Sequence, residues 1–282
     1  MVGARSQRPC ALTIAGSDSG GNAGIQADLR AFHCYGLHGC TVLTALTAQN
    51  PRGVRSVHEV PREFIADQLD AVFEMYGVKA LKTGMLCTAA AIETVAERLR
   101  RRPAVKKVVD PVMVATSGAR LLAEDAVEAM KELLLPLATV ITPNLPEAEV
   151  LLGRPVEGGD AMRDAARELS RKFGCAVLLK GGHAVERGAQ RRGRSAAAAE
   201  DVLFDGRRAT TLSRPAIAHP VSTHGTGCTL AAALAAGLAL GAPLAAVAER
   251  AKIFVYESIR LSYYIGRSCG VLGMPSQPGE QT

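Results

Sequence analysis

The stretch ALTIAGSDSGGNAGIQADLRAFHCYG, residues 11–36, predicts the opening unit of an α/β sheet. Residues 11–16 form a short apolar run that ends in glycine, as expected for a buried strand. A polar glycine-rich loop follows at 17–24, and residues 25–36 have the periodicity of an amphipathic helix. Residues 40–50 then predict a second buried strand that runs into a loop. This order indicates parallel strands joined by a crossing helix.

The same alternation of apolar strands and amphipathic helices continues to residue 182. It predicts a mostly parallel central sheet with helices on both faces, a three-layer α/β/α sandwich. No internal linker or repeat interrupts it, so we expect residues 1–282 to form a single domain. Helices are expected at 61–77, 88–102, 123–138 and 160–174, strands at 78–86, 105–113 and 175–182, and a strand, loop and short helix at 139–153.

The alternation of predicted strands and helices ends in the last third of the chain. Residues 184–200 contain glycine, arginine and alanine without a period, which predicts a mobile loop. Residues 201–215 predict two strands joined by an Asp-Gly turn. Two helices are expected at 226–240 and 243–266, and the proline-containing tail 274–282 is expected to fray.

Composition restricts the classes of partner and the cellular compartment. The net charge of +6 comes mostly from dispersed arginines, which favours anionic small molecules over nucleic acid. Aromatic residues make up 4% with no tryptophan, so base-stacking platforms are not expected. Seven cysteines without a Cys-x-x-Cys pair, no apolar leader and no membrane-length segment predict a cytoplasmic protein with reduced thiols, no zinc site and no membrane partner.

Candidate ligand-binding residues follow directly on the predicted strands, at the carboxyl ends where open α/β sheets collect ligands. Asp28, one turn into the first helix, could reach a ligand hydroxyl or simply be a favourable first-turn carboxylate. Gln49 offers a donor beside an acceptor, which matches an aminopyrimidine edge; a turn glutamine facing water is the alternative. Lys180 precedes two glycines and could contact phosphate or remain solvated.

Three oxygen-bearing side chains could hold a magnesium ion. Asp110 ends a predicted strand before proline, and Asn144 and Glu147 stand three residues apart around another proline. Their hard oxygens suit Mg²⁺, in part through waters. The competing interpretation is a helix capping box formed by Asn144 and Glu147.

The stretch VSTHGTGCTLAAALAAGLALG, residues 221–241, places glycines and a cysteine directly before an alanine-rich helix. Helix amino ends bind anions, and Gly225 and Gly227 would let the backbone approach a phosphate. Cys228 would lie in the first turn, where the helix dipole can lower the pKa of a thiol toward neutrality, so that it could accept a proton from an alcohol. Alternatively, Thr226 caps the helix and Cys228 is simply buried.

These motifs, in this order, closely resemble the ribokinase superfamily and, within it, the hydroxymethylpyrimidine/phosphomethylpyrimidine kinases of thiamine biosynthesis. The resemblance covers about residues 11 to 265. It implies a ribokinase-like homodimer that uses ATP and Mg²⁺ to phosphorylate 4-amino-5-hydroxymethyl-2-methylpyrimidine and then its monophosphate. The motifs are IAGSDSGGNAGIQADLRAF, ALTAQN, KTGML, DPVM, ITPNLPEAE, LLKGGH and THGTGCTLAAAL.

The resemblance also implies roles for individual residues. Cys228 takes the place where most sugar kinases of the superfamily carry a catalytic aspartate. The first loop departs from the family at Asn22, and the arginine-rich stretch 186–195 is longer than usual. The implied sites are a pyrimidine site of Gly16, Asp28, Gln49, Met85, Val112 and Cys228, an anion hole of Gly225, Thr226, Gly227 and Cys228, nucleotide contacts from Asn144 and Lys180, and metal ligands Asp110 and Glu147.

Three other functions remain open at this point. A pyridoxal kinase belongs to the same superfamily, and some members with a Gly-Thr-Gly-Cys loop act on both alcohols. A cysteine hydrolase would use Cys228 as nucleophile and His224 as base. A ligand sensor that binds a pyrimidine without phosphate transfer would not need both Cys228 and the Asn144–Glu147 pair.

Overall fold

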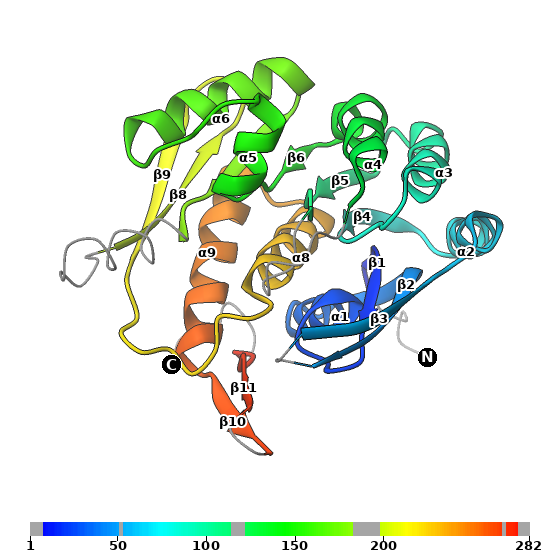
Figure 1. Ribbon diagram of the computed structural model, residues 1–282, viewed down its shortest axis with the longest axis horizontal. Helices are drawn as coiled ribbons and strands as arrows, with labels where there is room; N and C mark the ends of the chain where they lie inside the picture. Colours follow the sequence, from blue (N-terminus) through cyan, green and yellow to red (C-terminus); the bar gives the residue numbers. More distant parts are fainter. Residues whose placement is uncertain (1–7, 51–52, 114–121, 183–197, 267–268, 276–282) are drawn as a thin grey trace, which may run out of the picture.

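The computed structural model describes residues 8–50, 53–113, 122–182, 198–266 and 269–275 (Figure 1). Its centre is a nine-stranded sheet with the order β3-β2-β1-β4-β5-β6-β7-β8-β9. The six strands from β2 to β7 in this order pair in parallel, and β3, β8 and β9 add antiparallel pairings at the two edges. The strands are β1 Cys10–Asp18, β2 His38–Asn50, β3 Gly53–Glu59, β4 Val78–Thr83, β5 Lys106–Val109, β6 Val140–Ile141, β7 Ala176–Lys180, β8 Ala198–Phe204 and β9 Ala209–Pro215.

Both faces of the sheet are covered by helices, which confirms the predicted three-layer sandwich (Figure 1). One layer holds α1 Gly24–Cys34, α8 Thr226–Ala239 and α9 Leu244–Arg260. The other layer holds α2 Arg62–Met75, α3 Ala89–Arg100, α4 Glu124–Ala129, α5 Leu145–Leu152 and α6 Asp160–Phe173. A π turn at Met130–Leu134 and a 3-10 turn at Leu135–Leu137 continue α4.

The central strands are continuously apolar because each of their faces meets a separate core. In β1, Leu12 and Ile14 belong to the core beneath α2–α6, whereas Ala11 belongs to the core beneath α1, α8 and α9. All three side chains are fully buried. Parallel strands covered on both faces need this composition, and the run 11–16 shows it.

Two segments differ from the expectations. Most of the expected loop 184–200 lies outside the described residues, but 198–200 already belong to β8, where they pair with β9. The helix expected at 243–266 ends at Arg260, and a small hairpin follows, formed by β10 Tyr263–Ile265 and β11 Cys269–Val271. The hairpin packs against the loop before α8, since a Cβ atom at Gly270 would lie 2.1 Å from the carbonyl oxygen of Val221.

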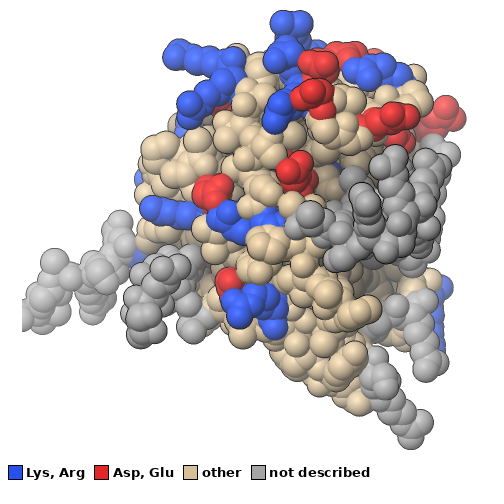
Figure 2. All heavy atoms as spheres, turned by 90° about the vertical axis from the view of Figure 1, so that its left-hand side faces the viewer, with Lys and Arg blue, Asp and Glu red and all other residues tan. Residues whose placement is uncertain are grey.

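Charged side chains on the outer face are mixed in sign. Figure 2 shows lysines and arginines interspersed with aspartates and glutamates on the face that carries α6 and α9. Arg163 and Arg167 on α6 each pair with an aspartate three residues earlier. In the part of the chain that the structure describes, none of the helices has the length and apolar character needed to cross a membrane.

The strand order places a switch point at the centre of the molecule. β1 lies between β2 and β4, so the chain leaves β1 toward one edge of the sheet and later continues on its other side. Ligands bind at such a point, outside the carboxyl ends of the strands. Gly16, Gln49 and Lys180 lie at the carboxyl ends of β1, β2 and β7. Met85, Asp110 and Asn144 directly follow β4, β5 and β6 at the same edge.

Candidate active site

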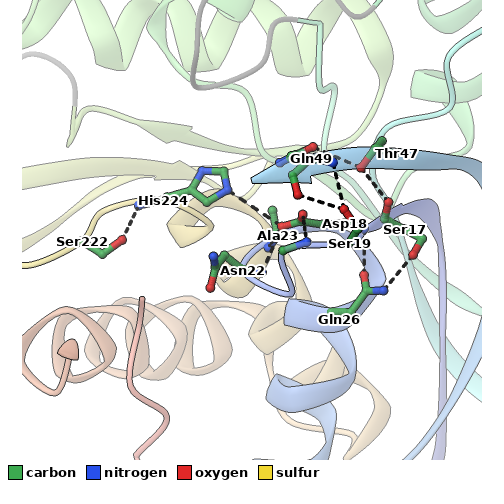
Figure 3. A network of polar contacts seen from close by, with 11 residues as sticks. Ser17, Asp18, Ser19, Asn22, Ala23, Gln26, Thr47, Gln49, Ser222 and His224 are labelled. Carbon is green, nitrogen blue, oxygen red and sulfur yellow. Dashed lines mark hydrogen bonds and ion pairs between the residues drawn. The ribbon is translucent and has the colours of Figure 1, made fainter. Parts of the chain in front are cut away.

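The loop after β1 is built around the carboxylate of Asp18 (Figure 3). Its Oδ1 accepts a hydrogen bond from the backbone N–H of Gly20 at 2.8 Å, and its Oδ2 accepts from the N–H groups of Asn22 and Ala23 at 2.9 and 2.8 Å. Asp18 is buried, so these donors replace the water that an ionised carboxylate would otherwise need. Asn22, the departure from the family pattern, uses only its backbone N–H in these contacts with Asp18.

Gln49 lies at the end of β2 and is tied to the same loop (Figure 3). Its backbone exchanges two hydrogen bonds with Ser19: Ser19 Oγ donates to the Gln49 carbonyl and accepts from its N–H, both at 2.8 Å. Thr47 donates to the side-chain Oε1 of Gln49 at 3.3 Å. These contacts fix the backbone of Gln49 beside the β1 loop, and the role of its side-chain amide stays a prediction.

Two glycines bring the chain segments of the proposed pyrimidine site close together. A Cβ atom at Gly16 would lie 2.5 Å from Cε of Met85, so the two predicted contacts adjoin each other. Gly24 has a φ of 55°, and a Cβ atom there would lie 2.4 Å from the carbonyl oxygen of Gly16. Only glycine permits this approach of α1 to the end of β1.

The amino end of α8 abuts the β1 loop. Gly225 is the N-cap residue with a φ of 89°, and a Cβ atom there would lie 2.0 Å from the carbonyl oxygen of Asn22. Thr226 is the first helical residue, and its hydroxyl donates to the Thr223 carbonyl, so the interpretation of Thr226 as the cap is wrong. The first-turn N–H groups of α8 therefore have no side-chain cap at Gly225 and suit an anion.

Beneath Cys228 lies a fully buried ion pair between Asp28 and Lys82. Lys82 Nζ lies 3.0 and 2.9 Å from the two carboxylate oxygens of Asp28, and Thr13 donates to Oδ2 of Asp28 at 2.6 Å. Neither charged side chain is exposed. Burial opposes the charge of Lys82, but Asp28 outweighs it and raises the pKa of Lys82. Burial also raises the pKa of Asp28, and Lys82 and Thr13 counter that shift only in part. Asp28 is thus held in place by protein groups, and its contact with a ligand stays a prediction.

The prediction that Cys228 has a lowered pKa is wrong in direction. Burial raises the pKa of the Cys228 thiol, and Asp28 and Asp110 add to this effect. Lys82 and a hydrogen bond with the backbone of Gly24 lower it by less. Desolvation of the thiol is therefore the largest influence on the pKa of Cys228.

Lys180 at the end of β7 is not solvated. Its Nζ lies 2.8 Å from Oδ1 of Asp110, which also accepts a hydrogen bond from Thr142 at 2.8 Å. The ammonium group lies 3.5 Å from the position that a Cβ atom would take at Gly227. Burial opposes the charge, but Asp110 and then Glu147 outweigh it and raise the pKa of Lys180. A lysine charge therefore lies beside the first turn of α8.

The capping box predicted as an alternative for Asn144 and Glu147 is confirmed. Oδ1 of Asn144 accepts from the Glu147 N–H, and Oε2 of Glu147 accepts from the Asn144 N–H, both at 2.8 Å. Burial raises the pKa of Glu147 to about 7, with Lys180 opposing and Asp110 adding to the shift. Capping fixes the carboxylate in place, so it is compatible with a role near a metal.

A magnesium site at Asp110 and Glu147 would need ligands from outside the protein. Among the described residues, no three acidic, histidine or cysteine side chains gather into a metal site. Magnesium is commonly bound through one or two carboxylates together with waters and substrate phosphates. Two fixed carboxylates close to Lys180 and the amino end of α8 fit that chemistry.

The structure thus brings most predicted residues to one edge of the sheet. Lys180, Asp110 and Glu147 interact directly or electrostatically, and Cys228 is coupled to Lys82 and Asp110. Val112 directly follows this group, and its N–H donates to the Asp110 carbonyl at 2.9 Å. Sequence reasoning assigned no role to Asp18 or Lys82, although a lysine inside the apolar run VKALKT of β4 was a detectable signal.

Several proteins are similar in sequence to this chain over most of its length. The family model described as phosphomethylpyrimidine kinase matches residues 18–273. The hydroxymethylpyrimidine/phosphomethylpyrimidine kinase of Rhizobium meliloti is 48% identical over 250 residues, which cover 88% of this chain and 90% of that protein. The thiamine biosynthesis bifunctional protein ThiED of Geobacter sulfurreducens is also 48% identical, over 93% of this chain, and the chain spans about half (51%) of its length.

A solved structure extends the comparison to three dimensions. The ADP complex of Bacillus subtilis pyridoxal kinase superposes with a TM-score of 0.85 at 37% identity, and the match covers 96% of this chain and 98% of that one. The fold is therefore the ribokinase-like α/β fold of these kinases. The family match over most of the sequence, together with a relative of 48% identity, shows that this chain belongs to the phosphomethylpyrimidine kinase family.

Proposed function

We propose that this chain is a hydroxymethylpyrimidine/phosphomethylpyrimidine kinase of thiamine biosynthesis. It transfers the γ-phosphoryl group of ATP to the hydroxyl of 4-amino-5-hydroxymethyl-2-methylpyrimidine, and a second phosphoryl group to the resulting monophosphate. The observation that carries the proposal is the meeting of Lys180 and the uncapped amino end of α8 at the switch point of the sheet. The 48% identity with a kinase of this name supports the choice of substrate.

The pyrimidine ring binds between the β1 loop and the end of β4. Gln49, held by Ser19 and Thr47, presents its amide to the aminopyrimidine edge, as a glutamine pairs with adenine. Gly16 and Met85 form the adjoining wall, and Val112 extends it beyond β5. Asp28, which is paired with Lys82, is the further residue predicted to contact the pyrimidine.

The phosphoryl group is received at the amino end of α8. Gly225, Thr226, Gly227 and Cys228 form this end and supply its backbone N–H groups, and the helix dipole favours the negative charge of the phosphoryl group. Lys180 adds a positive charge on the same side. Asn144, the N-cap residue of α5, lies next to Lys180 because the two residues form a backbone β-bridge. Mg²⁺ held by Asp110, Glu147 and the nucleotide phosphates would offset phosphate charge in the transition state.

Cys228 is the group that takes the proton. The hydroxyl oxygen forms a bond to the γ-phosphorus as the bond to ADP breaks, and the hydroxyl proton passes to the thiolate of Cys228. Because phosphoryl transfer has a loose transition state, the proton leaves late and a strong base is not required. The raised pKa of Cys228 keeps most of the enzyme in the thiol form at neutral pH.

ADP release in a coupled assay tests the proposal. Purified protein with ATP and hydroxymethylpyrimidine should release ADP only when the pyrimidine is present, and mass spectrometry should find the monophosphate and then the pyrophosphate. The absence of pyrimidine-dependent ADP release would refute the kinase assignment. A monophosphate that accumulates without pyrophosphate would limit the activity to the first step.

Pyridoxal kinase activity is the second candidate, because a pyridoxal kinase superposes over 96% of this chain. Comparison of kcat/KM for pyridoxal and hydroxymethylpyrimidine separates the two, and a preference for pyridoxal would replace the substrate given above. The hydrolase alternative is disfavoured, since a cysteine nucleophile needs a lowered pKa and that of Cys228 is raised. His224 faces Asp18 instead, with Nε2 4.0 Å from Oδ2 (Figure 3).

The assembly and the compartment belong to the same proposal. A homodimer is supported by the family resemblance and is tested by sedimentation, which should give twice the mass of one chain. A cytoplasmic location is supported by the reduced cysteines and by the bacterial kinases to which the chain is similar. Fractionation of cells that express the protein tests it.

A further inference from the structure

A second buried ion pair lies behind Lys180 and takes no direct part in the site. Lys252 of α9 places its Nζ 2.7 Å from Oδ2 of Asp201 in β8, with side chains only 10% and 5% exposed. The other oxygen of Asp201, Oδ1, accepts a hydrogen bond from the Gly181 N–H at 3.0 Å. Both oxygens of the Asp201 carboxylate therefore have a partner: one contacts the Lys252 ammonium group, and the other accepts the hydrogen bond from the Gly181 N–H.

The energetics of such a pair argue for a role beyond stability. Two charges lose their hydration on burial, and apolar residues of similar size often stabilise a protein equally well. The neighbouring core around α8 and α9 consists of alanine, leucine, valine and phenylalanine, so an apolar pair would suit it. What an apolar pair would not supply is an acceptor for the Gly181 N–H.

Gly181 directly follows Lys180, and the chain is fixed on both sides of this point. The Lys180 N–H donates to the Pro143 carbonyl at 2.8 Å, on the side of β6. A Cβ atom at Gly181 would lie 2.2 Å from the carbonyl oxygen of Glu200, on the side of β8. Asp201 thus holds the peptide that leaves Lys180 at the point where the chain turns away from the sheet.

We propose that Asp201 and Lys252 are positioning residues for nucleotide phosphate. Asp201 orients the Lys180–Gly181 peptide through the Gly181 N–H, and Lys252 holds the carboxylate of Asp201 in place. The effect is to hold the Lys180 ammonium between Asp110 and the first turn of α8. This inference rests on the proposed function, because it assigns Lys180 to the phosphates of ATP.

Two double variants separate orientation from packing. Asp201→Asn/Lys252→Met removes both charges but keeps a side-chain oxygen for the Gly181 N–H. Asp201→Leu/Lys252→Met removes both charges and the acceptor. Glu249→Gln is the matched control, since it breaks a partly exposed ion pair with Arg214 between α9 and β9 and leaves the hydrogen bond from Gly181 to Asp201 intact.

The measurements are ADP affinity by calorimetry, the KM values for ATP and pyrimidine, and the midpoint of thermal unfolding. We expect the leucine variant to bind ADP about tenfold more weakly and to raise the KM for ATP similarly, the effect of one lost hydrogen bond. The asparagine variant and Glu249→Gln should stay within about twofold of wild type. The KM for pyrimidine should not change in any of them.

Equal ADP affinities in the two double variants would overturn the proposal and leave the pair a packing element. If the leucine variant does not fold, hydrogen exchange of the Gly181 amide in the wild-type protein decides: slow exchange, slowed further by ADP, supports the proposal, and fast exchange overturns it. ADP binding does not require the pyrimidine. A wild type that binds ADP without phosphorylating pyrimidine would refute the proposed substrate and leave the comparison of variants valid.

Discussion

At the scale of single residues, the pKa of each ionisable side chain in this site depends on two opposing effects, burial and the charge of its neighbours. Cys228 and Glu147 both have raised pKa values because their surroundings exclude water. Lys82 and Lys180 remain charged in similar surroundings because each lies within hydrogen-bond distance of an aspartate. Desolvation thus raises the pKa of these two acids, whereas a nearby aspartate keeps each of the two lysines charged.

Cys228→Ala should lower kcat by about 10²–10⁴-fold, the usual contribution of a positioned proton acceptor. The affinity for ADP should remain close to that of the wild type, since the N–H groups of the anion hole belong to the backbone. Steady-state kinetics and calorimetry measure the two quantities. Cys228→Ser is the isosteric control, and an unchanged kcat in both variants would reduce Cys228 to a packing role.

The rate should also report the ionisation of Cys228. If the thiolate accepts the proton, and burial raises the pKa of that thiol, kcat should continue to rise above about pH 8.5, where an ordinary cysteine is half ionised. A pH–rate profile in buffers of constant ionic strength measures this. A plateau below that pH would mean that another group takes the proton.

Glu147 makes stability depend on pH in the opposite direction from most carboxylates. Its pKa is raised to about 7 in the folded protein, above the ordinary value, so the folded state binds more protons between the two pKa values. The free energy of unfolding therefore falls as pH rises from about 4.5 to 7, with a slope of about 1.4 kcal/mol per pH unit. Glu147→Gln keeps the capping acceptor and should flatten this part of the profile in urea unfolding. An equally steep profile in the variant would contradict this origin.

At the scale of elements, α8 combines an amino end without a side-chain cap and a buried segment composed mostly of alanine. Residues 231–236 are fully buried, and all but one of them are alanine. Because these side chains are small, α8 can pack closely on β4 and β5. At Gly237 the contact with α9 is closer still, because a Cβ atom there would lie 2.7 and 2.9 Å from the two γ-methyl groups of Val247. Small residues thus set the distance between the two helices and, through it, the position of the first turn of α8.

Gly237→Ala should destabilise the protein although alanine is the better helix former. The gain of about 1 kcal/mol from helix propensity is outweighed by overpacking against Val247, which costs about 1–3 kcal/mol. Denaturant unfolding measures the difference. In the double variant Gly237→Ala/Val247→Ala the added methyl finds room, so the two changes should be coupled. If the changes in the free energy of unfolding of the two single variants simply add up in the double variant, the helices can move apart freely.

At the scale of the whole molecule, one sheet carries two cores, and the site lies where the chain crosses from one half to the other. The core beneath α2–α6 and the core beneath α1, α8 and α9 share the strands β1 and β4–β8. Cys228 comes from one layer, and Asn144 and Glu147 come from the other. Site assembly therefore requires both layers to be folded.

The described residues should unfold as one cooperative unit, as expected for the single domain predicted from the sequence. Differential scanning calorimetry should give one transition, with a calorimetric enthalpy close to the van't Hoff value for the assembly present. ADP should shift the whole transition upward. Two transitions, of which ADP shifts only one, would divide the chain into separate domains.

The sequence by itself determined the three layers and the edge of the sheet at which most candidate residues gather. Strand and helix periods are local, and glycine motifs such as Gly16 and Gly225 mark close backbone contacts wherever they fold. Only the tertiary structure decided the pKa of Cys228, the pairing of Asp28 with Lys82 and the pairing of Asp201 with Lys252. Burial and charge partners separated by 54 and 51 residues arise from packing, and no local pattern encodes them. The hairpin after Arg260 was missed for the same reason, because its strands are stabilised by contact with the loop before α8.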